Sequence, residues 1–202
     1  MNRQVLKYTV VAILAGLSIA LNYLKIPLTP NTIITVYGLP LLFAGCCLDF
    51  TGSILVGALT GVILQLSSPY GITLTSPFWA LAPIGWVITS YFLNKVFNRL
   101  HLALRSFIIV VASSLVATGL NTLAMIAECW LINDAYYTYA SIATELPTRL
   151  LLMLVMIIPY TLLLYVLVDR VGPLYKKAFE KKEDLNKTKA SDDAIQDSNH
   201  QE

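Results

Sequence analysis

Long apolar runs separated by short polar segments fill most of the chain up to about residue 170. A helix needs about 20 apolar residues to cross a hydrocarbon core. On that basis six runs are interpreted as membrane spans: Val5–Leu24, Ile33–Leu48, Gly52–Leu66, Pro77–Leu93, Arg105–Ile132 and Pro147–Val168. Only Asp49-Phe50-Thr51 separates the short second and third runs, which predicts a tight hairpin of two short or tilted helices. The pattern predicts an all-α membrane protein, a bundle of six transmembrane helices.

The composition agrees with this pattern and adds a tail. Of the 202 residues, 56% are hydrophobic and only 13% are charged, which is too apolar for a soluble domain of this size. More than half of the 12 acidic residues follow Lys176, in a segment with too little apolar surface to fold alone. We therefore expect a membrane domain over 1–172 and a charged, disordered tail over 173–202. No basic stripe suggests that nucleic acid is a partner.

The basic residues predict the orientation in the bilayer. With six spans, three basic segments fall on the same side of the membrane: Arg3 and Lys7, then Lys95, Arg99 and Arg105, then Arg170, Lys176 and Lys177. Cytoplasmic loops carry an excess of lysine and arginine. Both termini and the tail are therefore expected to be cytoplasmic, and Arg149 and Glu128 to lie near the outer face.

Charged and amide side chains inside the last two apolar runs indicate a binding site. Arg149 lies at the mouth of the sixth run, and charges at membrane depth are costly and usually functional. Glu128 follows Asn121 by seven residues, close to two helical turns, so both point the same way. These residues predict a site for a polar solute. Two structural interpretations stay open: Asn121 ties two helices together, and Glu128 forms an ion pair with Arg149.

Aromatic residues flank the same predicted outer side. Trp79 and Tyr70 lie in or next to a connection rich in proline and hydroxyl groups. Their flat apolar faces could stack on a planar heterocycle. The alternative is an ordinary belt of aromatic side chains at the membrane interface.

Small residues recur every four positions in the first run, at Ala12, Gly16 and Ala20. Such a stripe allows another helix to approach closely. It is either a partner interface or a packing surface within this bundle. We expect packing within the bundle for the small residues of the second and third runs: Gly45, Gly52, Gly57, Ala58 and Gly61.

The chain lacks the usual motifs of catalysis. Cys46, Cys47 and Cys129 have no zinc-ligand spacing, and no histidine lies within a predicted span. No glycine-rich phosphate loop is present, so the chain is not expected to hydrolyse ATP by that route. An enzyme is disfavoured, and no metal or cofactor is expected in this chain.

Several stretches together resemble the folate-type substrate-binding subunits of energy-coupling factor (ECF) vitamin transporters. The resemblance covers roughly residues 5–170 and is carried by Leu120-Asn121-Thr122-Leu123, Leu146-Pro147-Thr148-Arg149-Leu150, Met156-Ile157-Ile158-Pro159, Leu164-Tyr165, Ile26-Pro27-Leu28, the run from Gly38 to Gly45, and Gly57-Ala58-Leu59-Thr60-Gly61. The stripe in the first run is similar to the family's Ala-x-x-x-Ala docking pattern.

This resemblance implies a six-helix subunit of a prokaryotic-type cell membrane that captures a vitamin from outside. Its implied partners are a transmembrane coupling protein and two ABC-type ATPases, which use the ATP. Arg149 and Asn121 match polar positions of the folate-type pattern, and Ala12, Gly16 and Ala20 match the docking stripe. Folate or a related pterin is the expected ligand, with Arg149 on its carboxylate and Glu128 and Asn121 on the heterocycle edge.

Other functions are left open by the sequence. Pantothenate or biotin could replace folate, and the Ile-Pro-Leu-Thr-Pro stretch from Ile26 is similar to biotin-type subunits. From different classes, the chain could be a self-sufficient secondary carrier or a membrane scaffold.

Overall fold

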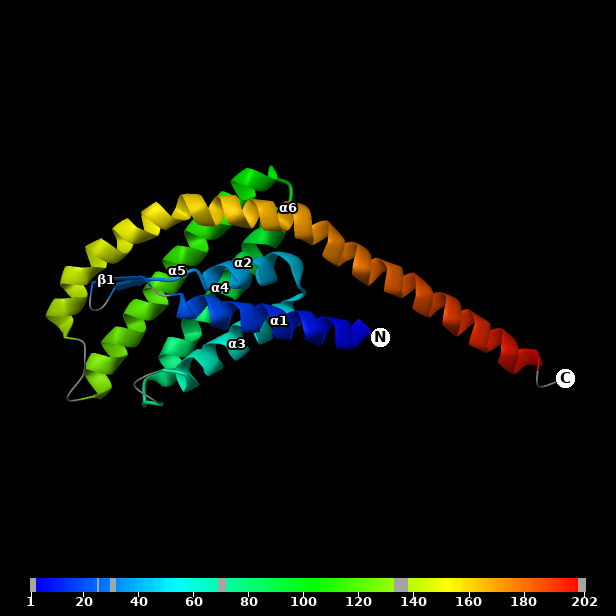
Figure 1. Cartoon of the computed structure of the whole chain (residues 1–202), viewed down its shortest axis with the longest axis horizontal. Coiled ribbons are helices and arrows are strands. Elements are labelled where there is room, and N and C mark those ends of the chain that lie inside the picture. The colour runs from blue at the N-terminus through cyan, green and yellow to red at the C-terminus, as the bar shows by residue number, and fades with distance from the viewer. Residues whose placement is uncertain (1–2, 25, 30–31, 69–71, 133–137, 200–202) are drawn as a thin grey trace.

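The computed structural model describes residues 3–24, 26–29, 32–68, 72–132 and 138–199. Within these residues the chain forms six helices and one two-stranded antiparallel hairpin (Figure 1): α1 (Arg3–Tyr23), β1 (Ile26–Thr29), β2 (Thr32–Ile34), α2 (Gly38–Cys47), α3 (Phe50–Leu66), α4 (Ser76–Val96), α5 (Leu102–Leu131) and α6 (Tyr139–Asn199).

Three of the described helices contain stretches long and apolar enough to cross a membrane. They are Gln4–Tyr23, Leu102–Leu131 and Tyr139–Tyr175. Large apolar side chains cover much of the outer surface of these helices, as in Ile13, Leu123 and Ile158. Such a surface is suited to lipid rather than water. The predicted class, a helical protein of the membrane type, is confirmed at this level.

The short helix α2 forms the centre of the bundle. It packs against α1, α3, α4 and α6. Seven of its ten residues are buried: Gly38, Pro40, Leu41, Leu42, Phe43, Ala44 and Gly45. A helix that is apolar on all sides is expected in a core. The predicted second span was wrong over its first part, because residues 32–34 pair as a strand and the helix begins only at Gly38.

The β1–β2 hairpin lies between α1 and α2. Ile26 pairs with Ile34, and an irregularity follows Pro27, whose ring nitrogen cannot donate to the ladder. The Ser18 hydroxyl donates to the Tyr37 carbonyl at 2.6 Å and so holds the end of this connection against α1. The proline-rich sequence predicts only a loop here, so the hairpin is a difference from the prediction.

Glycines bring α2 and α3 close to α4, as predicted. A Cβ added to Gly57 would lie 3.1 Å from the Ile84 Cα, and one on Gly61 would lie 2.7 Å from the Ala80 carbonyl oxygen. One on Gly45 would collide with the Ser90 hydroxyl. The backbones therefore approach too closely for larger residues at these positions.

Helix α6 differs most from the prediction. It begins at Tyr139 rather than at Pro147, passes through Pro147, Pro159 and Pro173, and stays helical to Asn199. It arches over the other helices before its last part leaves the bundle (Figure 1). Proline inside a helix removes a hydrogen bond and bends the axis. The tail predicted to be disordered is thus helical along its backbone, and its lysine, glutamate and alanine residues favour that conformation.

The elements define two ends of the bundle. One end carries the hairpin, the start of α4, the end of α5 and the start of α6, and is called the hairpin end (Figure 1). The other carries residues 97–101 between α4 and α5, and is called the connection end. Cys46, Cys47 and Cys129 are half-buried thiols. No group of potential metal ligands occurs among the described residues.

Candidate functional site

One face of α5 carries the polar side chains that the sequence singled out. Asn121, Met125 and Glu128 follow at intervals of four and three residues, which places them above one another on the helix. The rise from the first to the last is about 10 Å. Each of the three lies beside a different element of the bundle. This face of α5 therefore gathers predicted site residues that come from several elements.

Glu128 meets Trp79 at the hairpin end. The indole Nε1 of Trp79 donates to the Glu128 Oε2 at 3.3 Å, and both side chains are half-buried. Trp79 lies in the first turn of α4, directly opposite the last turns of α5. The two predicted site residues are therefore brought together, with the indole acting as a hydrogen-bond donor towards the carboxylate.

Arg149 reaches the same face from α6. Its Nη1 lies 2.8 Å from the Met125 Sδ, and its Nη2 lies 3.7 Å from the Glu145 Oε2. The Arg149 and Glu145 side chains are only 16% and 18% exposed, so solvent screens this pair less than a surface pair. A thioether is a weak acceptor. A carboxylate placed beside Arg149 would form a much stronger, charge-assisted hydrogen bond than the sulfur does.

Asn121 lies beside an aromatic layer formed by Tyr37, Trp86 and Tyr160. The Tyr37 hydroxyl lies within reach of the side chains of Asn121 and Trp86. Trp86 stacks on Tyr160 with ring centroids 5.9 Å apart, and the Tyr160 hydroxyl donates to the Thr35 carbonyl at 2.9 Å. Asn121 therefore faces the segment before α2, and the interpretation that it ties two helices together stays a prediction.

Two sets of predicted residues lie elsewhere or outside the description. Tyr70, the second predicted stacking residue, lies outside the described residues. Ala12, Gly16 and Ala20 lie on the exposed side of α1, and a Cβ added to Gly16 would meet nothing within 4 Å. The opposite side of α1 carries the buried residues Val11, Leu14, Ala15 and Ser18. Packing of the stripe within this bundle, one of the two interpretations above, is therefore wrong.

Sequence reasoning missed several residues of the cluster. Glu145 is four residues before Arg149, a spacing that places two side chains side by side on a helix and could have identified it. Met125 could have been found from its spacing between Asn121 and Glu128. Tyr37 and Tyr160 gave no local signal, because their positions depend on contacts between distant segments.

No family model, curated protein or solved structure matches this chain significantly. The resemblance to ECF substrate-binding subunits thus rests on the residues quoted above.

Proposed function

We propose that this chain is the substrate-capture subunit of an ECF-type importer, and that it binds a vitamin, folate or a related pterin first among the candidates. In this proposal the membrane domain spans the bilayer six times with both termini in the cytoplasm. The hairpin end then faces outwards, and the site opens towards the external solution.

The observation that carries the proposal is the convergence of Arg149, Glu128 and Trp79 on one face of α5. Charged groups are costly in an apolar bundle unless they are paired or used. A guanidinium binds a carboxylate with paired donors, and a carboxylate accepts from the ring N–H and amino groups of a heterocycle. A ligand that carries a carboxylate at one end and a nitrogen heterocycle at the other, with a flat apolar body between them, would complement this cluster.

The exposed stripe of α1 supports a partner in the membrane. Ala12, Gly16 and Ala20 leave a shallow surface flanked by Ile13 and Leu17, which are 60% and 48% exposed. A helix of a coupling protein could approach this surface to short backbone distance. ATP would then be hydrolysed by two associated ATPases rather than by this chain.

Six spans require that the shorter helices also cross the membrane. At about 1.5 Å per residue, the 21 residues of α4 extend about 31 Å and the 17 residues of α3 about 25 Å. The ten residues of α2 extend only about 15 Å. Non-helical backbone at membrane depth is tolerated where protein surrounds it, and we propose that the β1–β2 hairpin completes this crossing.

Reconstitution with and without partners tests the proposal. The tagged full chain is purified from a native membrane, the co-purifying proteins are identified, and uptake of labelled folate, pantothenate and biotin is measured in liposomes. The proposal expects a coupling protein with ATPases in the eluate, and uptake only when these and internal ATP are present. Uptake by the chain alone would instead identify a secondary carrier.

A further inference from the structure

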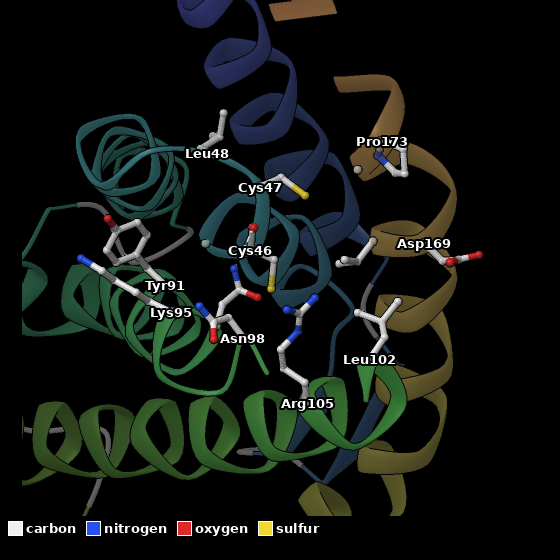
Figure 2. A pocket seen from close by; sticks show the side chains of 14 residues that line it. Cys46, Cys47, Leu48, Tyr91, Lys95, Asn98, Leu102, Arg105, Asp169 and Pro173 are labelled. Atoms are coloured by element: carbon white, nitrogen blue, oxygen red, sulfur yellow. Dashed lines mark hydrogen bonds between the residues drawn. The ribbon is translucent and has the colours of Figure 1, made fainter. Parts of the chain in front are cut away.

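A polar hollow lies at the connection end, remote from the Arg149 cluster. It has a volume of about 530 Å³ and is enclosed by the end of α2, the end of α4, the start of α5 and residues 168–173 of α6. Figure 2 shows Arg105 and Asn98 among the side chains that line it. This volume lies within the range of pockets that hold small ligands.

The Arg105 guanidinium points into the hollow towards Cys46 (Figure 2). The residue is half-buried, and among the described residues its guanidinium has no hydrogen bond or ion pair. Lys95 also belongs to the lining, but it is exposed and its ammonium points away from Arg105 (Figure 2). Asp169 is the acidic residue in the lining, but it points away from Arg105 and lies 3.5 Å from Arg170. The lining therefore has an excess of positive charge.

Arg105 is not needed to cap α2, the nearest helix end. The Asn94 amide already donates to the Cys46 carbonyl at 2.9 Å. The Ala44 carbonyl accepts from both the Leu48 backbone N–H and the Ser53 hydroxyl. With these carbonyls satisfied, the five N–H donors of Arg105 are available to an anion in the hollow.

We propose that this hollow binds a phosphate group. The fork of a guanidinium matches two phosphate oxygens, and a phosphate has a further oxygen for the Asn98 amide. The hollow opens where basic residues of the α4–α5 connection gather, a setting that attracts anionic lipid headgroups. The same chemistry would accept the phosphate of a small soluble molecule. This inference does not depend on the proposed vitamin site.

Binding is measured on the purified full chain in neutral detergent. The probes are phosphatidylglycerol, phosphatidylcholine as the zwitterionic control lipid, and sn-glycerol 3-phosphate as the soluble phosphate. Native mass spectrometry counts bound lipids, and thermal unfolding reports the stabilisation by each probe. Phosphatidylglycerol binding in preference to phosphatidylcholine identifies a lipid headgroup site, and saturable binding of glycerol phosphate identifies a soluble ligand. Failure of both phosphates to bind overturns the proposal.

Three variants locate the binding. Arg105→Gln should weaken binding of the preferred phosphate at least about tenfold. Arg99→Gln is the control, because it removes an exposed charge near the same connection that does not line the hollow. It should weaken binding less than about twofold. Gly172→Leu fills the hollow without changing charge. A Cβ there meets the Cys47 Sγ at 3.7 Å, an ordinary contact. Gly172→Leu should therefore fold but lose phosphate binding. Phosphate binding that is retained in Gly172→Leu or in Arg105→Gln overturns the proposal.

Discussion

The indole nitrogen of Trp79 donates to the Glu128 carboxylate at 3.3 Å and so joins the first turn of α4 to the end of α5. The contact spans 49 positions of sequence and closes the hairpin end of the bundle. The same contact holds the Glu128 carboxylate in place. Glu128 is three residues after Met125, whose Sδ is contacted by Arg149. The geometry of the cluster therefore depends on the packing of α4, α5 and α6 together.

Replacing the indole tests this contact. Trp79→Phe keeps an aromatic ring but removes the N–H donor, so we expect a loss of about 1 kcal/mol in stability from the unpaired carboxylate. The measurement is thermal unfolding of the purified protein in detergent. Trp130→Phe is the matched control, since Trp130 is also near the end of α5 but is 79% exposed. An equal loss in both variants would show that the hydrogen bond contributes nothing specific.

The aromatic layer offers a second test. Tyr160→Phe keeps the stacking on Trp86 but removes the hydroxyl that donates to the Thr35 carbonyl. We expect a stability loss of about 1 kcal/mol and faster amide hydrogen exchange around residues 35–38. Tyr165→Phe on the same helix serves as the control. Unchanged exchange at 35–38 in Tyr160→Phe would contradict a role in holding that segment.

Close packing of α2 on α4 predicts opposite outcomes at two glycines. Gly45→Ala places a methyl group against the Ser90 hydroxyl and the Val87 carbonyl, and should destabilise the protein by about 1–3 kcal/mol. In α5, the methyl group of Gly119→Ala would have no neighbouring atom within 4 Å. This variant should leave the stability of the protein unchanged or raise it by up to about 1 kcal/mol. Thermal unfolding compares the two. Tolerance of Gly45→Ala would refute the observed approach of the helices.

The exposed stripe of α1 predicts that a substitution there weakens binding of the coupling protein without affecting binding of the ligand. Gly16→Leu adds bulk where nothing lies within 4 Å, so the isolated chain should fold and bind ligand as before. Co-purification of the proposed coupling protein should fall at least about tenfold, because the helices can no longer approach. Gly119→Leu adds the same bulk to another exposed glycine and should leave co-purification unchanged. Normal assembly of Gly16→Leu would remove the stripe from the proposed interface.

Local patterns predicted the helices better than the connections. The apolar runs identified α1 and α5 within a few residues, because lipid-compatible length and composition are local properties. The hairpin from Ile26 to Ile34 was missed, since its proline-rich stretch pairs only once α1 and α2 position its ends. The helical backbone beyond Pro173 was missed because its composition favours both a solvated coil and an exposed helix.

The candidate site was predicted in part for the same reason. Asn121 and Glu128 share a helix face, which their spacing specifies. The contact of Glu128 with Trp79 joins two helices, and spacing carries no information about it. Arg149 was found from its unusual charge, but its contact with Met125 depends on how α6 crosses α5.

Ligand binding to the Arg149 cluster tests the central claim most directly. Equilibrium dialysis of the purified full chain measures binding of folate, pantothenate and biotin to the unmodified protein, to Arg149→Ala and to the exposed control Arg99→Ala. The account predicts saturable binding of one vitamin, folate first, at least about tenfold weaker in Arg149→Ala and unchanged in Arg99→Ala. Binding that Arg149→Ala leaves intact, or no binding of any of the three, would contradict it.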